Sequence, residues 1–74
     1  MKDDISYEIK ENIGSFGKRA NGWEWELNKI SWNGGETKFD LRPWAPDHAR
    51  MGKGITLTAE ELLDLQTVLS AVLL

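Results

Sequence analysis

Residues 23–44 have the sequence WEWELNKISWNGGETKFDLRPW, and this segment carries the clearest secondary-structure signal in the chain. Apolar and polar residues alternate on both sides of residues 33–36, NGGE, as they do in half-buried β-strands. Asn-Gly and Gly-Gly pairs are typical of tight hairpin turns, because asparagine and glycine tolerate positive φ. The segment therefore predicts two antiparallel strands, residues 23–32 and 37–44, joined by a turn.

The apolar residues of the first of these strands change parity halfway. They stand at odd positions first and at even positions later: Trp23, Trp25 and Leu27, then Ile30 and Trp32. A β-bulge at residues 28–29 would keep all five on one side of the sheet. Alternatively, the first tryptophans face the opposite side. The sequence also leaves open whether Trp23, Trp25 and Trp32 are core residues or stacking surfaces.

The flanking segments complete the fold. Alternating residues predict a strand at 5–13, a turn-rich loop at 12–22 and a short glycine-containing strand at 51–57. Thr58 and Glu61 form a capping-box pattern, which predicts a helix from Ala59 to near the C-terminus. We therefore expect a single α+β domain over residues 1–74, with the element order β-β-β-β-α.

The predicted helix is more apolar than one sheet requires. Placed at 100° per residue, its leucines and valines cover an arc about twice the ~100° stripe that a surface helix needs. A one-sided helix with an apolar end would leave much of this arc exposed. Self-association explains it better, since two-fold dimers are the commonest closed assembly. The expected interface residues are Leu62, Leu65, Leu69, Val72 and Leu73.

Composition excludes several classes of protein. The chain has 74 residues, no cysteine and one histidine, so neither a disulfide nor a conventional zinc site can compensate for a small core. A second subunit is the expected source of extra burial. The start of the chain lacks a signal-peptide pattern, and no stretch is apolar enough to span a bilayer. We expect a cytoplasmic protein without membrane contact.

Tryptophan and basic residues are interleaved in the central segment. All four tryptophans lie between Trp23 and Trp44. Aromatic rings on a sheet stack on unpaired bases, and lysine or arginine between them contacts phosphates. The third strand should expose one face, formed by Lys38, Asp40, Arg42 and Trp44. The candidate nucleic-acid-binding residues are Lys18, Arg19, Lys29, Trp32, Lys38, Arg42, Trp44 and Lys53.

No catalytic or cofactor-binding pattern accompanies these residues. His48 has no nucleophile motif beside it, and Lys53 lies between glycines but lacks the spacing of a phosphate-binding P-loop. The net charge of −3 keeps one alternative open, a module that docks a partner protein through its sheet or helix. Binding that weakens steeply with salt would distinguish phosphate contacts from apolar docking.

Four short segments resemble a known family. Residues 40–44, DLRPW, followed by residues 51–58, MGKGITLT, and a helix with an acidic start, resemble the transcriptional coactivator positive cofactor four family. Residues 26–33, ELNKISWN, and 44–48, WAPDH, are similar to its bacterial YdbC-like single-stranded-DNA-binding branch. The similarity covers nearly the whole chain.

The resemblance implies a fold and a function. It implies a curved four-stranded antiparallel sheet, a homodimer formed through the C-terminal helix, and two sheet surfaces that grip single-stranded DNA with little sequence preference. By position, Arg42 and Trp44 match the family's binding arginine and tryptophan, Lys53 its basic residue, and Trp32 loosely its other stacking aromatic. It also implies a role in transcription regulation, replication or repair alongside proteins of those processes. DNA and RNA are not distinguished.

Overall fold

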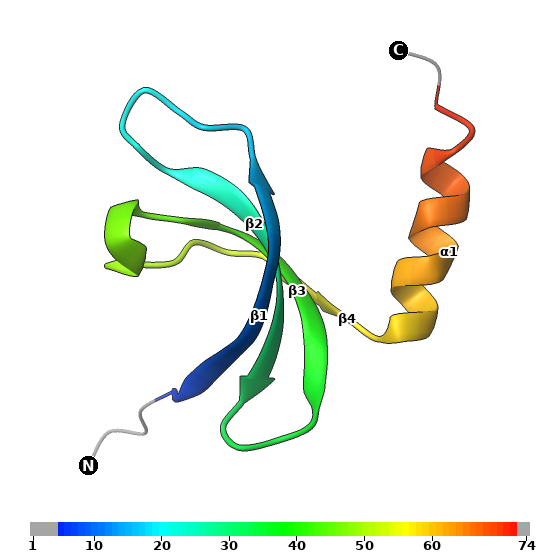
Figure 1. The fold of residues 1–74 in the computed structure, drawn as a ribbon, viewed down its shortest axis with the longest axis horizontal. Coiled ribbons are helices and arrows are strands. Elements are labelled where there is room, and N and C mark those ends of the chain that lie inside the picture. The colour runs from blue at the N-terminus through cyan, green and yellow to red at the C-terminus, as the bar shows by residue number, and fades with distance from the viewer. Residues whose placement is uncertain (1–4, 73–74) are drawn as a thin grey trace.

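A computed structural model describes residues 5–72 and shows a four-stranded sheet followed by one helix (Figure 1). All strand pairs are antiparallel, and the sheet order is β1-β2-β3-β4. The predicted fold class is confirmed. The elements are β1 (Tyr7–Phe16), β2 (Glu24–Trp32), β3 (Thr37–Trp44), the 3-10 turn η1 (Pro46–His48), β4 (Ile55–Leu57) and α1 (Ala59–Leu69).

The β2–β3 hairpin follows the sequence prediction. Asn33 and Gly34 both have positive φ, and Gly35 N–H donates to the Trp32 carbonyl at 2.8 Å. The register between the two strands runs without interruption from Glu24 opposite Trp44 to Ser31 opposite Thr37. Since β2 has no bulge against β3, the second explanation of the parity change is correct. The apolar residues of β2 face opposite sides of the sheet.

The irregularities lie in β1. Its register against β2 shifts between Ile9 and Glu11 and again between Asn12 and Gly14. Extra residues in one strand of a pair bend that strand and increase its twist. This bending carries β1 across the sheet in Figure 1. The strand also continues to Phe16, beyond the predicted end at residue 13, because residues 14–16 still pair with β2.

The sheet has two faces of different character. The even face is formed by Glu26, Asn28, Ile30, Trp32, Lys38, Asp40, Arg42 and Trp44, and the odd face by Trp25, Leu27, Phe39, Leu41, Ile55 and Leu57. Residues opposite each other on paired strands lie on the same face, so Tyr7 and Asn12 of β1 join the even face. The fully buried residues are on the even face, whereas Ile55 on the odd face is 51% exposed.

β4 is shorter than predicted. Residues 51–54 pass beside the end of β3 as a loop, with a single bridge between Met51 and Trp44. Two glycines allow this approach. A side chain at Gly54 would collide with the Arg42 side chain and the Leu41 carbonyl, and one at Gly52 with Pro43. The glycines around Lys53 therefore serve packing within the chain.

The helix begins as predicted but covers little of the sheet. Thr58 and Glu61 make both hydrogen bonds of the capping box. α1 stands beside the sheet and contacts mainly β3 and β4 (Figure 1). No residue of α1 is buried, and Leu69 and Val72 are 56% and 49% exposed. Leu73 lies outside the described residues. Within the described part, no helix is long and apolar enough to cross a membrane.

Candidate nucleic-acid interface

The even face carries a cluster of aromatic rings and one guanidinium. The Arg42 guanidinium lies 4.8 Å from the centre of the Trp32 ring. Tyr7 packs against Trp32 on one side and Trp44 on the other, with ring centroids 5.7 and 5.6 Å apart. Tyr7 is 38% exposed and Trp32 is half-buried. Sequence analysis did not include Tyr7 among the candidate binding residues, because its position beside Trp32 depends on the β1–β2 register.

A buried carboxylate fixes the position of Arg42. Asp40 is fully buried and accepts hydrogen bonds from Nε and Nη2 of Arg42, the second at 2.7 Å. The Thr56 hydroxyl also donates to Asp40, at 3.1 Å. Only 15% of the Arg42 side chain is exposed. The paired carboxylate balances the charge of the guanidinium while leaving its plane over Trp32.

The sequence prediction of an exposed face on the third strand is wrong for two of its members. Trp44 is only 1% exposed and Asp40 is fully buried. Two elements close over Trp44. Tyr7 of β1 covers one part of its ring, and His48 of η1 lies 4.5 Å from it, centroid to centroid. The indole is thus a core group that borders the even face, and its role in binding stays a prediction.

The structure distributes the predicted basic residues over both faces. Lys38 is exposed on the even face, opposite Ile30, which is two residues from Trp32 on β2. Lys29 lies on the odd face, where its ammonium is 5.6 Å from the centre of the Phe39 ring and 3.4 Å from Glu11. Lys53 borders an apolar hollow on the odd face with Trp25. Lys18 and Arg19 lie in the loop between β1 and β2.

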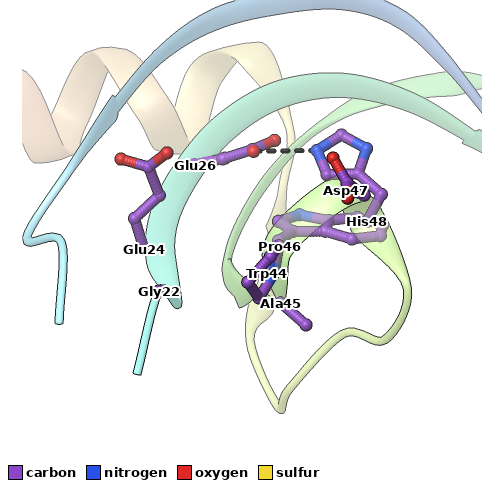
Figure 2. A pocket seen from close by; sticks show the side chains of 8 residues that line it. All are labelled: Gly22, Glu24, Glu26, Trp44, Ala45, Pro46, Asp47 and His48. Carbon is purple, nitrogen blue, oxygen red and sulfur yellow. Dashed lines mark hydrogen bonds and ion pairs between the residues drawn. The ribbon is translucent and has the colours of Figure 1, made fainter. Parts of the chain in front are cut away.

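A hollow of about 430 Å³ opens at the end of the even face, beside Trp44. Figure 2 shows Glu24 and Glu26 on one side of it and Trp44, Pro46 and His48 on the other. The residues that line it are Gly22, Glu24, Glu26, Trp44, Ala45, Pro46, Asp47 and His48. Sequence analysis missed this hollow, because its two walls are about twenty residues apart in the chain and meet only through the β2–β3 pairing.

A network of polar side chains supports the hollow. Asn12 donates to Asn28 at 2.6 Å, Asn28 donates to Glu26 at 3.0 Å, and Glu26 bonds His48 at 2.8 Å. Asn28 is fully buried and Glu26 nearly so. The network therefore positions His48 over Trp44. Among residues 5–72 there is no group of three or more metal-ligating side chains arranged to hold an ion.

Comparison with known proteins points to one family. A sequence model of the family described as Transcriptional Coactivator p15 (PC4) matches residues 19–68, which include β2, β3, β4 and nearly all of α1. An uncharacterized protein of Treponema pallidum (strain Nichols) is 45% identical over 71 residues, which cover 96% of this chain and 84% of the relative. The matched segment contains Trp32 and Arg42 but not Tyr7.

Proposed function

This chain belongs to the Transcriptional Coactivator p15 (PC4) family, a family of non-enzymatic proteins that bind single-stranded DNA, and we propose that it is itself a single-stranded-DNA-binding homodimer with little sequence preference. Its role lies in transcription regulation, replication or repair in the cytoplasm, beside proteins of those processes. It belongs to the bacterial YdbC-like branch. RNA is a second candidate ligand, since stacking and phosphate contacts do not require a particular sugar.

The observation that carries this proposal is the cluster of Tyr7, Trp32 and Arg42 on the even face. Exposed aromatic rings on a sheet stack on unpaired bases at about 1–3 kcal/mol per base, whatever the base. The Arg42 guanidinium lies over the Trp32 ring, 4.8 Å from its centre, and adds a flat cationic group on which a base can stack. A duplex hides the faces of its bases, so this surface selects single strands.

We assign the phosphate contacts mainly to exposed lysines. Because the charge of Arg42 is balanced by the buried Asp40, it contributes little to the release of counterions. Lys38 is exposed on the even face and is the basic residue placed to contact a strand that stacks on Trp32. Lys18, Arg19, Lys29 and Lys53 are proposed to contact phosphates where the strand leaves this face.

The exposed apolar surface supports the homodimer. Among the described residues only three apolar ones are buried, Ile30, Trp44 and Ala45. A chain of this size needs more burial than that to be stable alone. On α1, Leu63, Val68 and Leu69 are 63%, 64% and 56% exposed. A second copy is proposed to cover the helix, with Leu62, Leu65, Leu69, Val72 and Leu73 at the interface.

The test is a titration of tryptophan fluorescence with an unstructured thymine oligonucleotide at about 50 and 200 mM salt, with a duplex as control. We expect quenching by the single strand, weaker affinity at the higher salt, and much weaker quenching by the duplex. Absence of quenching at the lower salt would contradict the proposal. It would favour the alternative, a module that docks a partner protein through the apolar odd face or helix.

A further inference from the structure

A loop residue, His48, supplies part of the cover over the buried ring of Trp44. The His48 imidazole lies 4.5 Å from the Trp44 ring, centroid to centroid, with 35° between the ring planes. Tyr7 supplies another part of the cover, at 5.6 Å. An unpaired base stacks on tryptophan through the same kind of contact between rings. His48 therefore occupies a surface of Trp44 on which a base would otherwise stack.

The two covering residues differ in how firmly they are held. Tyr7 belongs to β1, which is paired with β2, and it also packs against Trp32. His48 belongs to η1, which has no buried residue, and 39% of its side chain is exposed. Within the described part of the chain, its imidazole makes a single hydrogen bond, from Nε2 to Glu26 at 2.8 Å (Figure 2). Rotation of one side chain is thus enough to remove the His48 part of the cover.

The surroundings of His48 allow this rotation. Glu26 keeps its other carboxylate oxygen bonded to Asn28 at 3.0 Å and to Asn12 at 3.4 Å. Glu26 also lines the hollow of about 430 Å³, so water can replace the imidazole as the partner of the released oxygen. Trp44 lines the same hollow, which gives a base room to approach its ring.

The charges around the hollow decide which part of a strand enters it. Three of its lining residues are carboxylates, Glu24, Glu26 and Asp47, and none is lysine or arginine. These carboxylates repel phosphates, whereas a base is neutral. The sugar–phosphate backbone therefore stays outside, and a base reaches the ring of Trp44.

We propose that His48 is an intramolecular competitor of the bound strand, because its imidazole occupies Trp44 in the free protein and leaves when an unpaired base stacks there. The competition rests on the proposed function and adds regulation to the same binding face. It introduces no sequence preference, since every base has a face that stacks on tryptophan. The free protein keeps Trp44 covered, and binding uncovers it.

The first test follows the His48 ring by NMR while the full chain is titrated with an unstructured thymine oligonucleotide. The chain contains one histidine, so the ring C–H signals are assigned without ambiguity. In the free protein these signals are displaced by the ring current of Trp44. We expect saturation with the strand to move them toward the positions of a solvent-exposed histidine.

The second test compares the affinities of the wild type, His48→Asn and Asp47→Asn for the same strand, by fluorescence anisotropy of a labelled oligonucleotide. His48→Asn removes the ring and keeps a residue that tolerates the positive φ of 56° at this position. Asp47→Asn is the matched control, because the neighbouring residue has a φ of 58° and its replacement leaves the imidazole in place.

We expect His48→Asn to bind the strand about tenfold more tightly than the wild type, which lies in the lower part of the range that one stacked base provides. Asp47→Asn should change the affinity by only about twofold, since one charge acts weakly on phosphates through water.

The remaining outcomes separate the competition from the proposed function. If the strand binds but the His48 signals stay in place, the competition is refuted and the proposed function stands. Equal or weaker binding by His48→Asn also refutes it, as does an equal gain in Asp47→Asn. If neither the wild type nor the variants bind a single strand, the proposed function itself fails. The NMR titration uses the wild type, so it decides the question even if His48→Asn does not fold.

Discussion

The buried ion pair under the stacking surface makes a quantitative prediction. Asp40 is fully buried and accepts from two nitrogens of Arg42 and from Thr56. Asp40→Asn keeps the shape of the side chain but removes its charge. The guanidinium is then left without a counter-ion in a site where 15% of its surface reaches solvent.

The expected loss of stability is large for a small protein. Removing one partner of a buried pair destabilises by about 3–5 kcal/mol, because the remaining charge is uncompensated. Partial exposure of Arg42 allows some hydration, so we expect about 3 kcal/mol. For 74 residues, the usual range of about 0.05–0.15 kcal/mol per residue gives a total of roughly 4–11 kcal/mol. The variant should fold but lose a large part of its stability.

Urea denaturation of four proteins tests this reasoning: wild type, Asp40→Asn, Arg42→Met and the double variant. Each single variant leaves one buried charge unpaired, whereas the double variant leaves none. The double variant should therefore lose about 2 kcal/mol less than the sum of the single losses. As a control, Glu8→Gln removes the exposed partner of Lys10 and should change stability by less than about 1 kcal/mol. Additive losses for Asp40→Asn and Arg42→Met would refute the reasoning.

Three other predictions follow from the exposed surfaces and the helix. Leu69→Glu should convert the homodimer to a monomer, and a variant that sediments as a folded dimer would contradict the interface. Lys38→Gln should reduce the slope of log affinity against log salt by about one, and an unchanged slope would remove Lys38 from the phosphate contacts. Thr58→Ala removes the helix cap and should lower the free energy of unfolding by about 1 kcal/mol, a loss that thermal denaturation should detect.

Local signals predicted most of the fold. The Asn33-Gly34 turn, the alternation in β2 and β3 and the Thr58 capping box all depend on neighbouring residues, and all are present in the structure. The strand order follows from them because each strand pairs with the next one in sequence. The apolar excess of the helix was also visible, since helical periodicity is a local property.

The surface properties of the site could not be predicted in the same way. Alternation showed that Trp44 shares a face with Lys38 and Arg42, but it did not show which face the curved sheet encloses. Charged neighbours suggested exposure, whereas Tyr7 and His48 cover the ring. The bulges in β1 have no sequence signal that alternation detects. They appear only in the register against β2.

Because Trp44 and Asp40 are buried, contrary to the sequence prediction, the choice of mutations for testing binding changes. Replacing Arg42 and Trp44 together would remove the partner of buried Asp40 and a ring that is 1% exposed. Loss of binding in that double variant would then report a destabilised fold. Trp32 and Tyr7 are partly exposed and are the better positions for testing stacking.

Mapping of NMR shifts during titration with a thymine oligonucleotide tests most directly whether the even face binds a single strand. Each of the four tryptophans contributes one indole N–H, and they lie in different parts of the structure. We predict that the Trp32 indole and the amides of Lys38 and Arg42 shift most, while Trp25 on the odd face and the amides of α1 stay nearly constant. Shifts concentrated on Trp25 and α1 would contradict the account.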